Sequence, residues 1–90
     1  MNQNITMQKI RVIAKEVPKS STHEAFVSYS IVNDGGRLVD LRFCRTVDTR
    51  LFEGMKKFEV SAEVEDASAR YEYPRYYCKA IDPATLVKIA

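Results

Sequence analysis

Four of the five tyrosines in this 90-residue chain lie in one short stretch, where they alternate with basic residues. The cluster consists of Tyr71, Tyr73, Tyr76 and Tyr77, interleaved with Arg70, Arg75 and Lys79. Side chains two residues apart in a strand share a face, so Arg75, Tyr77 and Lys79 are predicted to form a row of cation, ring and cation. Aromatic faces stack on bases and cations neutralise phosphates, which is how proteins hold a single nucleic-acid strand without reading its sequence.

We expect six residues to form such a binding face. They are Tyr77, Tyr73, Arg75, Lys79, Arg42 and Phe26. Phe26 is included because it shares a predicted strand face with two serines, Ser28 and Ser30. The partner would be single-stranded nucleic acid, with DNA favoured. Tyrosine and arginine are also enriched where proteins meet. A protein-interaction or assembly module that uses the tyrosine-rich face as its interface is therefore the alternative.

The residues that most enzymes need are not arranged for catalysis. The one histidine, His23, lies in a polar segment beside Glu24, with no second ligand at metal-binding spacing. The glycine pair in Asn33-Asp34-Gly35-Gly36 lacks the helix and lysine of a phosphate-binding loop. The sequence predicts a non-catalytic protein with no metal, cofactor or small-molecule substrate.

The charge distribution and the cysteines indicate which class of partner and which cellular compartment to expect. The net charge is +2, but residues 1–45 carry seven Lys/Arg against four Asp/Glu (+3), and residues 46–90 carry seven against eight (−1). A basic excess is compatible with a polyanionic partner. Cys44 and Cys78 form no CxxC pair, and no stretch has the layout of a membrane span or signal peptide. We expect a cytoplasmic protein with both thiols free and no membrane partner.

Five segments show the alternation with a period of two that is typical of β-strands, namely 9–17, 25–32, 37–45, 56–66 and 75–81. The Asn33–Gly36 segment predicts a tight hairpin between the second and third strands. Residues 46–55 lose the alternation and predict one or two helical turns, capped by Asp48 or Thr49 and ended by Gly54. The segment after Asp82 fits either a helix start or a continued strand.

The chain is expected to form one domain over residues 9–90, after a flexible leader at residues 1–8. Three aromatic side chains are assigned to its core: Phe43, Phe58 and Tyr29. The order of strands, hairpin and helical connection is that of an OB-fold. This predicts a mainly β fold, a small five-stranded Greek-key barrel with one short helix between strands three and four.

Within this layout, residues 9–87 resemble the OB-fold single-stranded DNA-binding proteins of bacteria and phages. The resemblance is carried by Leu41-Arg42-Phe43, by the turn Gly54-Met55-Lys56-Lys57, and by Ala80-Ile81-Asp82 with Leu86. It implies DNA binding without catalysis, a homo-oligomer, and an origin in a phage or mobile element. Those proteins usually place tryptophan on the binding face, and this chain has none.

Overall fold

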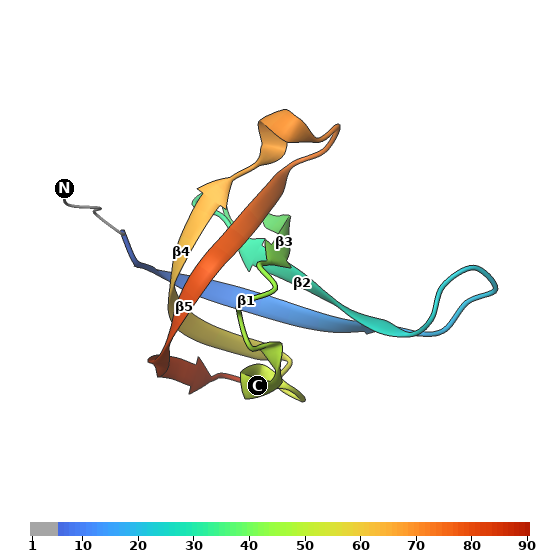
Figure 1. The fold of residues 1–90 in the computed structure, drawn as a ribbon, viewed down its shortest axis with the longest axis horizontal. Helices are drawn as coiled ribbons and strands as arrows, with labels where there is room; N and C mark the ends of the chain where they lie inside the picture. Colours follow the sequence, from blue (N-terminus) through green and yellow to red (C-terminus); the bar gives the residue numbers. More distant parts are fainter. Residues whose placement is uncertain (1–5) are drawn as a thin grey trace.

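A computed structural model describes residues 6–90 and shows a closed barrel of five strands (Figure 1). The strands are β1 (Gln8–Val17), β2 (Phe26–Val32), β3 (Leu38–Phe43), β4 (Lys57–Asp66) and β5 (Arg75–Lys88). Around the barrel their order is β1-β2-β3-β5-β4. β3 and β5 pair in parallel, and every other neighbouring pair is antiparallel. This architecture confirms the predicted mainly β, OB-like barrel.

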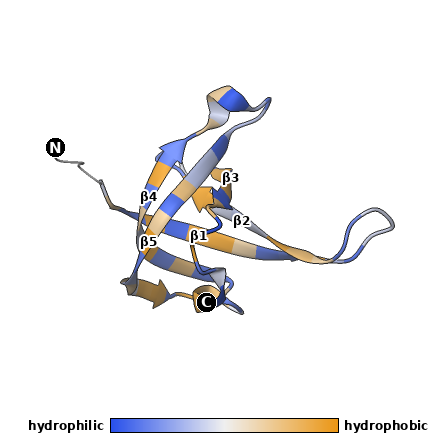
Figure 2. Ribbon diagram, in the orientation of Figure 1, coloured by the Kyte–Doolittle hydropathy of each residue, from blue (hydrophilic) through white to orange (hydrophobic). Residues whose placement is uncertain are grey.

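Alternation along the strands places the apolar side chains inside the barrel. Hydrophilic and hydrophobic positions alternate along β4, whose buried residues fall at every second position (Figure 2). The fully buried side chains of largest volume are Phe52, Phe58, Leu41, Val12, Val60 and Cys78. Tyr29 and Phe43 are partly buried and pack against this core, as predicted. Both cysteines are free, and Cys78 is part of the core.

The connection from β3 to β4 is not the helix that the sequence predicts. It contains only a four-residue 3-10 turn, η1 (Thr49–Phe52), capped by Asp48, whose Oδ1 accepts a hydrogen bond from the Arg50 amide at 3.1 Å. Gly54 has a positive φ of 82° and turns the chain toward β4. The first turn of an α-helix fixes the backbone of several residues and gains only one hydrogen bond, so a helix this short is unfavourable by itself. The short connection instead gains its stability by burying Phe52, which is 1% exposed.

The hairpin between β2 and β3 forms as predicted. The side-chain oxygen of Asn33 accepts hydrogen bonds from the amides of Gly35 and Arg37, both at 2.9 Å. Gly36 adopts a φ of 78°, a left-handed conformation that glycine adopts readily because it has no Cβ atom. This turn fixes the register in which β3 follows β2.

β5 continues as a strand well past the predicted end at residue 81, to Lys88. Its ladder with β4 is interrupted near Pro83, which has no amide hydrogen to donate. At this interruption the hydroxyl oxygen of Thr85, in place of a strand carbonyl, accepts a hydrogen bond from the Ser61 amide at 2.8 Å. A second register shift leaves Lys79 as an extra residue. As a result Ile81 packs against the core, although strict alternation would place it on the same outer face as Tyr77 and Lys79.

β1 and β2 extend beyond the barrel as a two-stranded arm, formed by Lys15–Val17, Phe26–Ser28 and the loop that joins them (Figure 1). Of the predicted leader, residues 1–5 lie outside the described residues. Thr6 and Met7 are exposed and precede β1, and Gln8 already belongs to that strand. Within residues 6–90, none of the helices has the length and apolar character needed to cross a bilayer.

Candidate functional site

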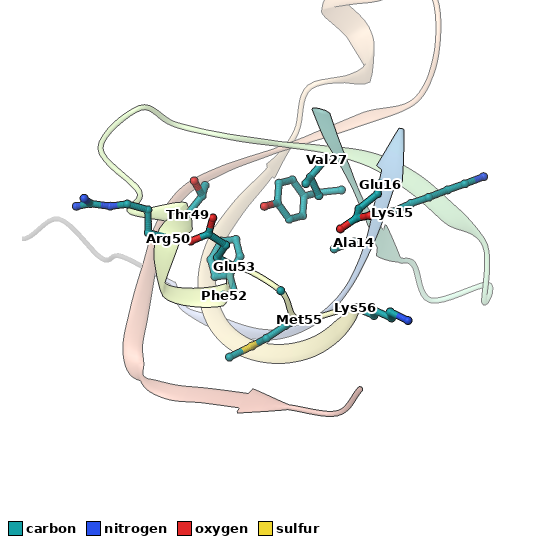
Figure 3. A pocket seen from close by; sticks show the side chains of 12 residues that line it. Ala14, Lys15, Glu16, Val27, Thr49, Arg50, Phe52, Glu53, Met55 and Lys56 are labelled. Carbon is teal, nitrogen blue, oxygen red and sulfur yellow. The ribbon is translucent and has the colours of Figure 1, made fainter. Parts of the chain in front are cut away.

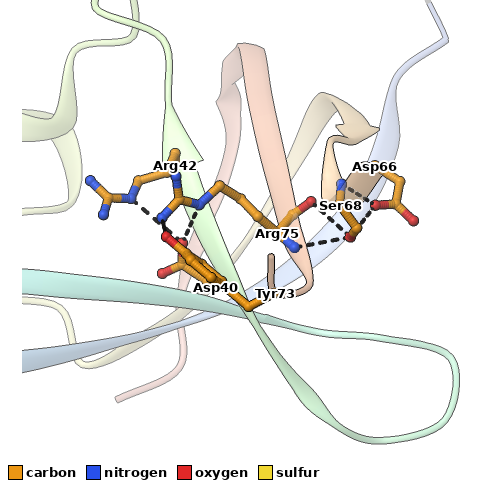
Figure 4. A network of polar contacts seen from close by, with 6 residues as sticks. All are labelled: Asp40, Arg42, Asp66, Ser68, Tyr73 and Arg75. Atoms are coloured by element: carbon orange, nitrogen blue, oxygen red, sulfur yellow. Dashed lines mark hydrogen bonds and ion pairs between the residues drawn. The ribbon is translucent and has the colours of Figure 1, made fainter. Parts of the chain in front are cut away.

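Arg75 lies at the start of β5 and pairs across the parallel ladder with Asp40 of β3. Its Nε atom donates to the Asp40 Oδ2 at 2.7 Å, and the arginine side chain is only 10% exposed (Figure 4). Arg75 is therefore not the open cation that the sequence predicts. It is a nearly buried, charge-paired residue that links two strands.

Two tyrosines of the loop between β4 and β5 cover this guanidinium. The Arg75 Cζ lies 4.2 Å from the ring centroid of Tyr71 and 4.7 Å from that of Tyr73, and its Nη2 donates to the Tyr73 hydroxyl. Cation–π contacts of this kind are stronger where the cation has lost water. The two residues still expose 44% and 48% of their surface. Arg75 thus holds two aromatic rings in place while much of each remains open to solvent.

Hydrogen bonds at both ends of the same loop fix its position. Asp66, the last residue of β4, accepts from the amide and hydroxyl of Ser68 at 2.9 and 2.5 Å, and these bonds lower the pKa of its carboxyl. The Ser68 hydroxyl in turn accepts from the Arg75 amide at 3.0 Å, and the Ala67 amide donates to the Arg75 carbonyl at 2.9 Å. A short 3-10 turn, η2 (Ser68–Arg70), completes this anchor. The tyrosines are consequently carried by an ordered loop.

Three further cations around the tyrosines are exposed. Arg42 has a 63% exposed side chain and shares Asp40 with Arg75, at 3.5 Å. Arg70 and Lys79 share Glu65, at 2.6 and 3.2 Å, and their side chains are 66% and 44% exposed.

These ion pairs join four cations to two carboxylates, and Asp66 at the end of β4 and Glu72 in the loop add two more, so the cluster as a whole has no net charge (4 − 4). The hydrogen bond from Arg70, followed by that from Lys79, lowers the pKa of Glu65. Exposed pairs of this type are worth little. The three exposed cations can therefore exchange a carboxylate for another anion at small cost.

Tyr77 lies beside this cluster on the outer side of β5, between Arg42 and Glu65 in the ladder. It is half-buried, and its hydroxyl is hydrogen-bonded to the thiol of Cys44. Hydrogen bonds from Thr46, at 3.2 Å, and then from Tyr77 lower the pKa of Cys44 to about 7. The bond to Cys44, more than burial, raises the pKa of Tyr77. The ring of Tyr77 is thus positioned by a neighbouring strand end.

Five of the six predicted site residues are brought together, and Phe26 is not. Phe26 pairs with Val17 on the arm, which projects away from the barrel (Figure 1). The sequence prediction left Tyr71 and Arg70 out of the binding face, although both belong to the cluster it identified. Their position between two predicted strands could have identified them, because loops held by a rigid scaffold commonly carry binding residues. Asp40 was missed as well, since only the parallel pairing of β3 with β5 places it beside Arg75.

A cavity of about 630 Å³ lies elsewhere, between the arm and the η1 connection (Figure 3). The arm contributes Val27 and Tyr29 to its walls, and the connection contributes Phe52, Glu53 and Met55. Burial, and then the charge of Glu53, raises the pKa of Tyr29. In Figure 3 the side chains of Lys15 and Lys56 point outward, so no cation converges on the space. The cavity is suited to an apolar group and not to a phosphate.

A search for metal-binding groups and comparisons with other proteins do not assign a function to this chain. Within residues 6–90, no three His, Cys, Asp or Glu side chains are grouped so that they could hold a metal ion. No protein-family model, no curated protein and no solved structure matches this chain.

Proposed function

We propose that this barrel binds single-stranded nucleic acid, with DNA as the favoured form, through the tyrosine-bearing loop and the outer side of β3 and β5. The observation that supports this most is the Arg75 clamp, which holds Tyr71 and Tyr73 side by side with ring centroids 6.1 Å apart. Rings fixed before the ligand arrives lose little conformational freedom when bases stack on them. Each stacked base would contribute roughly 1–3 kcal/mol.

The phosphates of the strand would be neutralised by the exposed cations Arg42, Arg70 and Lys79. These side chains leave exposed carboxylates to do so, and each contact releases counterions from the nucleic acid. Arg75 has a different part, because it positions the rings and does not reach the ligand. No bond is made or broken in this function. The resemblance to bacterial and phage single-stranded DNA-binding proteins also predicts an origin in a phage or mobile element.

Fluorescence titration of a labelled oligo-dT strand tests the proposal, with an oligo-U strand of equal length to compare DNA with RNA. Binding should be clear at low salt and weaken steeply at moderate salt. Tyr71→Ala should raise Kd roughly 5- to 150-fold, which corresponds to the loss of one stacked base. Tyr71→Phe keeps the ring and should bind almost as the parent does. Lys88→Gln removes an exposed cation of β5 outside the cluster and serves as the matched charge control.

Two results would contradict the proposal. One is the absence of binding to either strand at low salt, and the other is binding that Tyr71→Ala and Tyr73→Ala both leave unchanged. The alternative function makes a different prediction. If the tyrosines form a protein interface, their alanine variants should change the mass of the particle in solution while neither strand binds at all.

A further inference from the structure

The arm has backbone edges without a neighbouring strand on both of its sides. The ladder between β2 and β3 begins at Tyr29, so the Phe26–Ser28 edge has no neighbouring strand there. On the other side the ladder between β1 and β4 ends at Ile13, and beyond it only the Ala14 amide bonds to Lys56, at 2.9 Å. A two-stranded hairpin is marginally stable by itself in water. Its free edges are a template for another strand.

The arm also exposes apolar side chains on both of its faces. Phe26 is 51% exposed and Val27 is 44% exposed, and as neighbours in a strand they point to opposite faces. Val17 lies across the ladder from Phe26. A hollow of about 400 Å³ is lined by these residues together with Pro18, Ala25 and one charged residue, Glu16. Contiguous exposed apolar surface of this kind marks an interaction site.

The charges of the arm identify the partner. The segment Ala25–Ser28 carries no charge, and the rest of the arm carries two cations, Lys15 and Lys19, against two carboxylates, Glu16 and Glu24. The arm therefore has no net positive charge to attract a polyanion. A second copy of the uncharged segment would bring no like charge against it. Two copies related by a two-fold axis present the same edge to each other in antiparallel orientation, which closes the interface.

We propose that two copies of this chain pair arm to arm through the free edge of β2 at Ala25–Ser28, forming one four-stranded antiparallel ribbon. Addition of a strand at an edge supplies main-chain hydrogen bonds, and the side chains set the specificity. Phe26 and Val27 would be covered on the two faces of the ribbon. This inference does not depend on nucleic-acid binding, because the proposed binding face lies on β3, β5 and the loop between β4 and β5.

Sedimentation velocity of the full chain tests this pairing between roughly 10 and 500 µM, the range in which a small interface associates. The mass of the parent should rise from one copy to two. Phe26→Lys and Val27→Lys each place a charge in the ribbon and should weaken the dimer about tenfold or more. Leu38→Lys is the matched control, because Leu38 is 60% exposed but lies outside the arm. Circular dichroism and thermal melts should show that all three variants fold.

A parent that stays at the mass of one copy over the whole range would overturn the inference. So would a dimer that both arm variants retain, or one that Leu38→Lys weakens equally. An oligo-dT strand of about six nucleotides, short enough for one barrel, separates this test from that of the proposed function. Folded Phe26→Lys should bind it as the parent does. If it loses that binding, Phe26 contacts the strand and the arm is not an assembly edge.

Discussion

The Nε atom of Arg75 lies 2.7 Å from the Oδ2 of Asp40, across the only parallel pair of strands in the described barrel. This bond joins residues 35 positions apart. It also orients the guanidinium that Tyr71 and Tyr73 cover. One ion pair therefore serves the closure of the barrel and the placement of the rings.

Removing the carboxylate of this pair should destabilise the fold. Asp40→Asn leaves a nearly buried guanidinium without its counter-charge, so Tm should fall by about 5 °C or more. Arg11→Gln, which removes an exposed pair with Glu59, should leave Tm nearly unchanged. Thermal melts followed by circular dichroism measure both. An equal Tm for Asp40→Asn and the parent would show that the pair contributes nothing to stability.

Salt dependence should identify the cations that meet phosphates. If Arg42 and Arg70 each contact one phosphate, replacing either with Gln should reduce the slope of log K against log salt by about 0.7 for a single strand. Lys88→Gln should leave the slope unchanged. Titrations at four or more salt concentrations give the slopes. A slope that neither arginine variant alters would mean that these side chains remain on Asp40 and Glu65 when the strand binds.

Alkylation should distinguish the two thiols. The pKa of Cys44 is lowered to about 7, whereas burial raises that of Cys78 to about 11. Because the thiolate is the reactive form, the rate at Cys44 should rise with pH, with its midpoint near 7, and Cys78 should stay unmodified.

Thr46→Ala removes the main hydrogen bond to the Cys44 thiolate and should move the midpoint toward the higher pH of an ordinary thiol. Mass spectrometry of iodoacetamide-treated protein between pH 5.5 and 9 reads out both sites. Modification of Cys78 in the folded protein would contradict its burial.

Phe52 should contribute more to stability than any other residue of the connection between β3 and β4. Its ring stacks on Phe58 at 4.4 Å between centroids and also contacts Phe43 and Tyr29. Phe52→Ala should therefore cost about 3–5 kcal/mol of the free energy of unfolding. Leu51→Ala, at a neighbouring residue that is 42% exposed, should change it by less than about 0.5 kcal/mol. Urea unfolding measures both, and similar losses would show that Phe52 does not anchor this connection.

Local pattern was sufficient to predict the barrel. Alternation in 56–66 and the Asn33–Gly36 turn each depend on neighbouring residues alone, and both elements form as expected. The helix expected in 46–55 does not form, because burial of Phe52 in the barrel decided the shape of that connection. The length of β5 was left open as well. The hydroxyl oxygen of Thr85 replaces a strand carbonyl as the acceptor of the Ser61 amide near Pro83, and that contact depends on a distant strand.

The candidate site was predictable as a cluster and not as a geometry. Tyrosines and cations at alternate positions indicated an outer face that combines rings with charge. The predicted OB-like barrel brings β3 and β5 together, but sequence spacing does not give the register between them, so the pairing of Asp40 with Arg75 could not be foreseen. The same applies to Glu65, which joins Arg70 and Lys79 only because of the β4–β5 register. Cations that the sequence pattern presents as unpaired are therefore paired with carboxylates in the structure.

The parallel pairing of β3 with β5 also has a kinetic consequence. The hairpin of β2 and β3 needs only a short turn. The β3–β5 ladder joins segments 35 residues apart, so the chain loses the entropy of closing this long loop before the ladder can form any stabilising contact. We expect the meander of β1, β2 and β3 to gain structure early in refolding. The last step would be the closure of the barrel, in which β4 and β5 dock together onto the meander through the β1–β4 and β3–β5 ladders, at the millisecond-to-second rates of proteins dominated by non-local pairing.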